Sequence, residues 1–139
     1  HSYVAIAYGQ RRKIQQAPAE RRGTLLEAYR QTLKGVKLST KGIPLLLAHR
    51  RVLEASYYNF EGKEDKARSL LAEAEEIAVD TENAWAQYEI HLERARFAWG
   101  RNDLDGARKR FLRAKEYAEE RGWRARAQRC SDILEELTA

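Results

Sequence analysis

The 139-residue sequence contains no methionine, one cysteine and only two prolines. With Cys130 alone, no disulfide can form within the chain, which fits a reducing compartment such as the cytoplasm. Proline and β-branched residues are scarce, whereas Ala, Leu, Glu, Arg and Lys are abundant, and this composition favours helix over strand. These absences predict an all-α protein located in the cytoplasm.

The sequence also lacks long apolar runs and the common enzymatic motifs. No run reaches the roughly 18 residues that a membrane-spanning helix needs, so we expect no membrane contact. A Gly-rich phosphate loop, Cys-x-x-Cys, His-Glu-x-x-His and Gly-x-Ser-x-Gly are all absent. His49 and His91 have no third ligand in helical register, so we interpret them as structural or surface residues. We therefore expect no enzymatic activity, no catalytic residue, no cofactor and no metal site.

The charge is unevenly spread. Residues 1–42 contain nine basic and two acidic residues, residues 43–83 five and nine, and residues 84–139 twelve and ten. This pattern predicts a basic N-terminal part and an acidic middle. Because the chain begins with His1 and has no methionine, we also expect it to be a piece of a longer protein, with His1 left from a tag.

Apolar residues recur at spacings of three and four, which is typical of amphipathic helices. The pattern predicts helices over about 2–16, 19–36, 44–60, 64–79, 83–100, 103–121 and 123–137, with Leu38–Pro44 as a connection. The short connections predict antiparallel neighbours. Cys130 lies on the apolar side of the last helix, so we interpret it as a core thiol.

The fourth and sixth predicted helices match each other position by position. The matching positions are Ala67, Leu71, Ala74 and Ala78 over Ala107, Phe111, Ala114 and Ala118. The helices that precede them match in the same register, with Ala55 over Ala95 and Tyr58 over Ala98. Alanine at a crossing lets two helices approach closely, and the larger residue one turn away fills the space beside it. Such self-similarity predicts stacked helical hairpins.

These residues resemble the tetratricopeptide repeat. Ala55, Tyr58, Gly62, Ala67, Leu71 and Ala74 fit one unit, and Ala95, Ala98, Asn102-Asp103-Leu104, Ala107, Phe111 and Ala114 fit the next. The spacing between the units is longer than the family's repeat of about 34 residues, and no proline closes either unit. The resemblance implies a single domain built as a right-handed solenoid of about seven helices. Its segments are a degenerate repeat or cap (1–43), two repeats (44–82 and 83–122) and a C-terminal capping helix (123–139).

The resemblance also implies a function. The long, irregular units look like the helical-repeat sensor regions of large bacterial signalling proteins and transcription activators, so we expect a regulatory module that binds another protein or peptide. In the family, the first helices of successive hairpins line a concave groove. The positions carried over are Arg50, Glu54, Tyr57, Asn59, Gln87, His91, Arg94, Arg96, Arg124 and Gln128. The arginines favour an acidic or carboxylate-bearing ligand, because a guanidinium donates two parallel hydrogen bonds.

Three alternatives stay open. Nucleic acid would be held by basic clusters such as Arg11-Arg12-Lys13, Arg50-Arg51 and Arg108-Lys109-Arg110. A self-associating structural module is another, since an excised solenoid exposes an apolar end and tends to dimerise. The alternative fold is a compact helical bundle without a groove.

Overall fold

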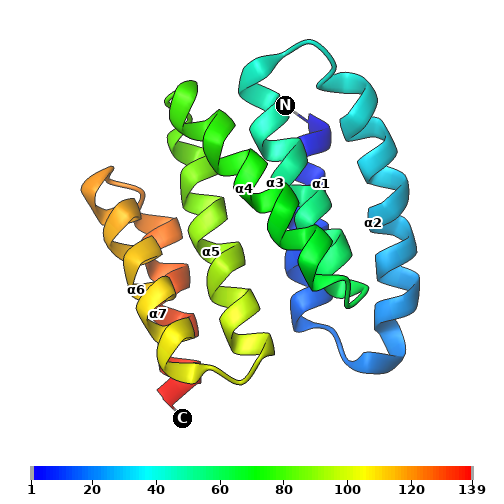
Figure 1. Cartoon of the computed structure of the whole chain (residues 1–139). Helices are drawn as coiled ribbons and strands as arrows, with labels where there is room; N and C mark the ends of the chain where they lie inside the picture. Colours follow the sequence, from blue (N-terminus) through cyan, green and yellow to red (C-terminus); the bar gives the residue numbers. More distant parts are fainter. Residues whose placement is uncertain (1, 139) are drawn as a thin grey trace. The chain divides into compact units, whose positions relative to one another are not determined.

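The computed structural model describes residues 2–138, which contain seven α-helices and no strand (Figure 1). The helices are α1 (Ser2–Gln16), α2 (Ala19–Ser39), α3 (Pro44–Phe60), α4 (Glu64–Asp80), α5 (Ala84–Gly100), α6 (Leu104–Glu120) and α7 (Arg124–Thr138). The predicted all-α class is confirmed. Only α2 differs clearly from its predicted bounds, because it continues through Leu38 and Ser39. It ends at Thr40, whose hydroxyl donates to the carbonyl of Val36 at 2.7 Å.

The same kind of turn recurs at regular intervals from Gly42 onward. One residue in each connection has a positive φ, and these residues are Gly42, Gly62, Glu82, Asn102 and Gly122. In the last four connections, the residue after the positive-φ residue donates its backbone N–H to the carbonyl five residues earlier, in the last turn of the preceding helix. These hydrogen bonds run from Lys63 to Tyr58, Asn83 to Ala78, Asp103 to Ala98 and Trp123 to Ala118. This is the Schellman type of helix ending. Each sequence repeat is therefore a pair of equally long helices, each followed by the same short turn.

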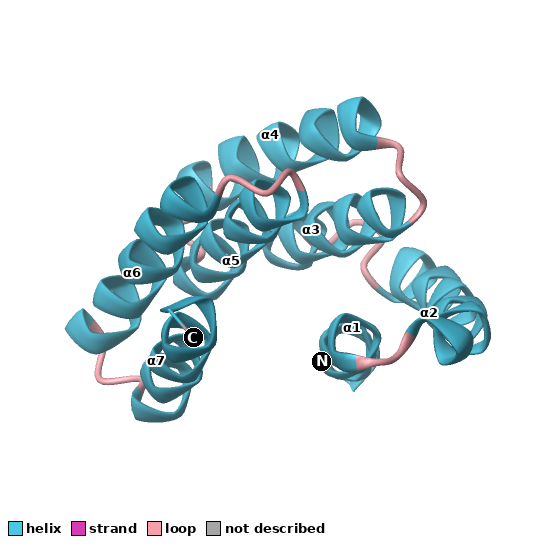
Figure 2. Ribbon diagram, turned by 90° about the horizontal axis from the view of Figure 1, so that it is seen from below, coloured by secondary structure: helices cyan, strands magenta, loops and turns pink. Residues whose placement is uncertain are grey.

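The chain divides into two compact units, residues 1–86 (unit 1) and 87–139 (unit 2), with the division inside α5. In unit 1, α1 and α2 form one hairpin and α3 and α4 another (Figures 1 and 2). In unit 2, α6 packs against α7. The predicted segment edges near residues 43, 82 and 122 coincide with the connections α2–α3, α4–α5 and α6–α7.

The core of unit 1 uses small residues where its helices come close. The buried side of α4 consists of Ala67, Leu71, Ala74 and Ala78, as the repeat pattern predicted. Between α2 and α3, the buried Tyr29 hydroxyl donates to the carbonyl of Leu53 at 2.8 Å. His49 on α3 is only 2% exposed, and its Nδ1 lies 2.7 Å from the hydroxyl of Tyr8 on α1. The structural interpretation of His49 is thus confirmed.

The core of unit 2 centres on Tyr88, Phe111 and the alanines of α6, with Cys130 from α7. Cys130 is fully buried, and its Sγ lies 3.7 Å from the Tyr88 hydroxyl. Burial raises the pKa of the Cys130 thiol, which keeps it protonated. The prediction of a core thiol is confirmed. Over the described residues, no helix has the length and apolar character to cross a membrane.

Candidate protein-binding surface

In unit 1, three of the four predicted groove residues share one side of α3. Glu54 and Tyr57 follow Arg50 by about one and two helical turns, whereas Asn59 follows by about two and a half turns and points to the opposite side. Arg50 Nε lies 3.6 Å from a Glu54 carboxylate oxygen. The structure therefore brings Arg50, Glu54 and Tyr57 together and separates Asn59 from them.

Ion pairs compensate most of the charge on this side of α3. Glu54 also receives a hydrogen bond from Arg51 Nη1 at 2.8 Å, and Arg51 Nε lies 3.4 Å from a carboxylate oxygen of Glu73 on α4. A ligand that binds Arg50 or Arg51 through a carboxylate must compete with these internal partners. Such an exchange of one partly exposed ion pair for another contributes little net affinity.

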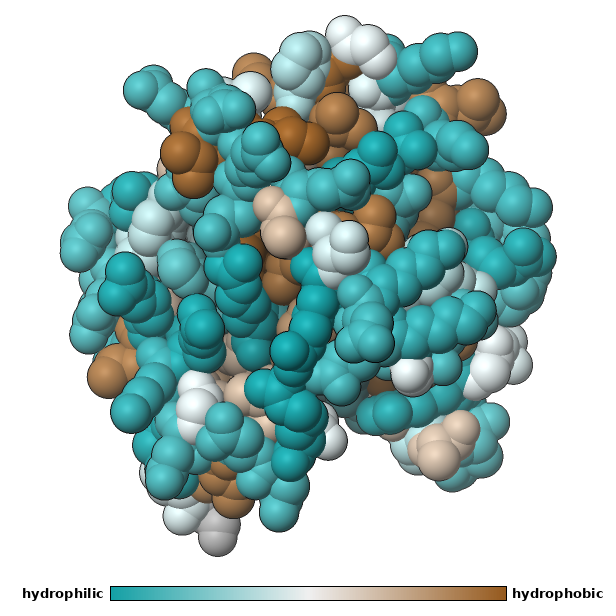
Figure 3. All heavy atoms as spheres, in the orientation of Figure 1, coloured by the Kyte–Doolittle hydropathy of each residue, from teal (hydrophilic) through white to brown (hydrophobic). Residues whose placement is uncertain are grey.

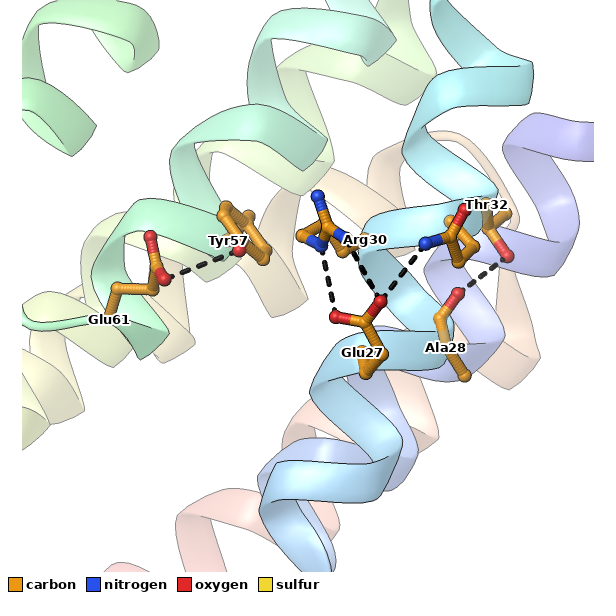
Figure 4. A network of polar contacts seen from close by, with 7 residues as sticks. Glu27, Ala28, Arg30, Thr32, Tyr57 and Glu61 are labelled. Atoms are coloured by element: carbon orange, nitrogen blue, oxygen red, sulfur yellow. Dashed lines mark hydrogen bonds and ion pairs between the residues drawn. The ribbon is translucent and has the colours of Figure 1, made fainter.

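Tyr57 lies where polar contacts within α3 come close to polar contacts within α2 (Figure 4). Its hydroxyl donates to a Glu61 carboxylate oxygen at 3.3 Å, and Arg30 on α2 lies between this tyrosine and Glu27. Arg30 donates two hydrogen bonds of 3.0 Å to the Glu27 carboxylate, and Gln31 donates a third. The hydrogen bond from Arg30, followed by that from Gln31, lowers the pKa of Glu27 to about 2. Tyr57 is thus positioned by contacts within the chain.

In unit 2, Gln87, His91 and Arg94 share one side of α5 at the same spacing of four and three residues. Gln87 and His91 both contact Tyr117 of α6. The Tyr117 hydroxyl donates to Gln87 Oε1 at 2.7 Å, and the His91 ring centre lies 5.6 Å from that of Tyr117. Tyr117 is half-buried, and desolvation raises the pKa of its hydroxyl, which keeps it a hydrogen-bond donor.

Guanidinium groups stack on the aromatic rings of this region. The Arg121 guanidinium lies 3.4 Å from the ring centre of Tyr117, and Arg121 Nη1 also donates to the Tyr117 carbonyl at 3.0 Å. The Trp123 ring lies 6.3 Å from that of Tyr117 and carries the Arg126 guanidinium at 4.7 Å. We call Gln87, His91, Tyr117, Arg121, Trp123 and Arg126 the Tyr117 cluster. It combines half-buried aromatic rings with oriented cationic donors.

The remaining predicted residues of unit 2 do not join this cluster through a described contact. Arg96 follows Gln87 by about two and a half turns and stacks instead on Trp99 and Phe111, at 5.3 and 5.5 Å from their ring centres. Arg124 is exposed on α7 directly after Trp123. Gln128, also exposed, donates to the Asp132 carboxylate at 2.9 Å.

The sequence pattern does not single out four residues of the cluster as binding residues: Tyr117, Arg121, Trp123 and Arg126. Tyr117 and Trp123 fit the apolar stripes of the last two predicted helices, and the two arginines are part of the basic stretch near the C-terminus. The sequence signal that could have identified the two aromatic residues is their type: Tyr and Trp add a polar group to an otherwise apolar position near a helix terminus.

The pattern also missed two buried carboxylates of α5, Glu89 and Glu93, which are 4% and 1% exposed. In the alignment of the two repeats they stand where His49 and Leu53 are buried in α3.

Some arginines of the basic clusters that suggested nucleic acid are engaged within the chain. Arg11 is buried, and its guanidinium lies 4.8 Å from the ring centre of Tyr8. Arg108 Nη1 donates to the Asp105 carboxylate at 2.9 Å, and Arg50 and Arg51 form ion pairs. Lys109 and Arg110, in contrast, are exposed and form no ion pair within residues 2–138.

Comparison with family models, curated proteins and solved structures finds no match for this chain. The resemblance to tetratricopeptide repeats is therefore a prediction from the sequence pattern. In the described residues, no three His, Cys, Asp or Glu side chains lie where they could hold a metal ion together.

Proposed function

We propose that this protein is a non-enzymatic binding module that holds another polypeptide, as a regulatory part of a larger protein. The observation that carries the proposal is the Tyr117 cluster, in which Tyr117 and Trp123 each have a guanidinium stacked on the ring. Tyr, Trp and Arg are the residues most enriched among those that dominate protein–protein binding energy. The repeated helices and turns of α3–α6 support the proposal, because repeated helical hairpins commonly form surfaces for polypeptides.

The cluster is organised before any ligand arrives. The bond from Tyr117 to Gln87, together with the stacking of Arg121, fixes the ring and the guanidinium relative to each other. A ligand therefore loses less affinity to the ordering of these side chains than it would on a mobile arginine. The guanidinium of Arg121 also has a carboxylate of Glu120 at 3.7 Å, a distance at which an exposed pair is weak.

The polarity of the cluster favours a ligand with a carboxylate. Arg121 and Arg126 present N–H donors above the faces of the Tyr117 and Trp123 rings, so an acidic side chain could accept hydrogen bonds while its neighbour packs against the exposed part of a ring. We propose an acidic peptide segment as the ligand of this surface. Nucleic acid and self-association are the alternative functions.

Site-specific photo-crosslinking tests the location. A photoreactive phenylalanine derivative replaces Arg124, which is exposed and adjacent to Trp123, or Glu135, which is exposed on α7 about two and a half turns after Arg126 and so on the opposite side from it. In lysate of the source cells, we expect position 124 to yield a discrete crosslinked polypeptide and position 135 to yield much less. Equal yields at the two positions, or none at position 124, would remove the Tyr117 cluster as the binding surface.

A further inference from the structure

Unit 1 exposes an apolar patch at the end formed by α1, α2 and the α2–α3 connection. Tyr3 and Ile6 on α1 are 46% and 52% exposed, Leu38 on α2 is 78% exposed, and Ile43 after it is 44% exposed. We call these four residues the Leu38 patch. Figure 3 shows apolar side chains near the α2–α3 connection, set among hydrophilic ones. A leucine this exposed, with three exposed apolar residues on the same part of the unit, marks a contact surface.

Local packing makes the patch continuous across two helices. A β-carbon on Gly35 would lie 2.7 Å from Cδ1 of Tyr3, so the Tyr3 ring rests on the backbone of α2. Leu38 follows Gly35 by about one turn of α2, and Ile6 follows Tyr3 by about one turn of α1. Glycine at position 35 is what allows this close approach. Tyr3 and Leu38 are thus both exposed near the place where α1 contacts α2.

A row of lysines borders the Leu38 patch. Lys34 and Lys37 follow Arg30 at steps of four and three on one side of α2, and Lys41 lies in the connection directly after the end of the helix. The three lysines are exposed and form no ion pair within the described residues 2–138, whereas Arg30 is bound to Glu27. Lys34 has an additional electrostatic interaction with Glu27, whose single charge is already shared with Arg30. The lysine row therefore gives the border of the Leu38 patch a net positive charge.

We propose that the Leu38 patch and this lysine row form a second docking surface, for an acidic amphipathic helix of another protein. The aliphatic side of such a helix would cover Tyr3, Ile6 and Leu38, and its carboxylates would face Lys34, Lys37 and Lys41. The positive charge of the lysine row favours an acidic ligand at this surface. A second copy docked through α2 would place the lysine row against itself, and the aliphatic half of the patch gives nucleic acid no partner. This surface is independent of the Tyr117 cluster.

The test uses the whole chain and a short fluorescent helical peptide with a leucine stripe and glutamates on the other side. The controls are a scrambled peptide of the same composition, a leucine–lysine peptide, vesicles of phosphatidylcholine with phosphatidylserine, and single-stranded DNA. All titrations use the Arg121→Glu variant, in which the Tyr117 cluster no longer offers the glutamates a second site. Fluorescence anisotropy should then show binding of the acidic amphipathic peptide alone. Leu38→Gln should weaken it about tenfold, because a largely exposed leucine is covered. Lys37→Glu should weaken it and reduce its dependence on salt.

Two variants make the result specific. Val79→Gln removes a different exposed aliphatic residue, 59% exposed on α4, and should leave peptide binding unchanged. Comparing the chain with and without Arg121→Glu measures any additional binding of the peptide at the Tyr117 cluster, so that failure of either surface is seen separately. The proposal is overturned if the scrambled peptide binds equally well, or if Leu38→Gln has no more effect than Val79→Gln. It is also overturned if only vesicles or DNA bind, or if Leu38→Gln merely abolishes self-association measured by sedimentation.

Discussion

Replacing Glu82 by glycine should stabilise the protein. Glu82 occupies the left-handed position of the α4–α5 turn, with φ of 51°, where Gly62 and Gly122 stand in the equivalent turns. A residue with a β-carbon costs about 1–2 kcal/mol in this conformation. Glycine avoids that cost but loses about 0.5–1 kcal/mol through the greater freedom of the unfolded chain. The expected net gain is therefore about 0.5–1 kcal/mol, which corresponds to a Tm increase of roughly 2–4 °C.

Glu82→Ala is the matched control, because it removes the carboxylate but keeps the β-carbon. It should change the free energy of unfolding by only a few tenths of a kcal/mol. Gly62→Ala and Gly122→Ala provide the converse, since a β-carbon at either position would meet no atom within 4 Å. Each should therefore destabilise by about 0.5–1 kcal/mol through the backbone alone. Urea unfolding followed by circular dichroism measures all four. If Glu82→Gly gains no more than Glu82→Ala, the reasoning about the turn is wrong.

Two further predictions concern polar contacts. Asn83→Ala should lower the free energy of unfolding by about 1–2 kcal/mol, because Asn83 accepts from the Ala86 N–H at 3.1 Å and donates to the Leu45 carbonyl at 2.7 Å. Asn83→Asp, which keeps only the acceptor, should lose less in the same urea titration. The Glu27 carboxyl, with a folded pKa of about 2 against about 4.3 unfolded, should favour the folded state above pH 4.3 and lose that contribution as the pH falls toward 2. A carboxyl NMR titration should show that Arg30→Gln raises this midpoint, and an unchanged midpoint would contradict the assigned cause.

The helices were predictable because their signals are local. The stripe of Ala107, Phe111 and Ala114 fixes both the helix and its buried side, and Pro18 separates the first two helices. The predicted end of α2 at about residue 36 is wrong by about one turn. Ser39 and Thr40 are typical of a connection, whereas in the structure Ser39 is helical and the Thr40 hydroxyl donates to the Val36 carbonyl. The regular spacing of the turns was partly hidden, since Glu82 gives no sign of a left-handed residue.

The candidate site was only half predictable. A spacing of four and three residues places Gln87, His91 and Arg94 on one side of α5, because one helix fixes their relative directions. The same rule, applied strictly, would have removed Asn59 and Arg96. Tyr117 could not be assigned to Gln87 from sequence, because their contact spans 30 residues and depends on how α6 packs.

Capture of partners from lysate of the source cells on the immobilised protein tests the central proposal most directly, with and without nuclease and at low and moderate salt. The proposal of a polypeptide-binding module predicts a discrete protein that is retained after nuclease treatment and at moderate salt. Loss of all captured material on nuclease treatment, with a steep fall between the two salt concentrations, would contradict it and assign the function to nucleic acid.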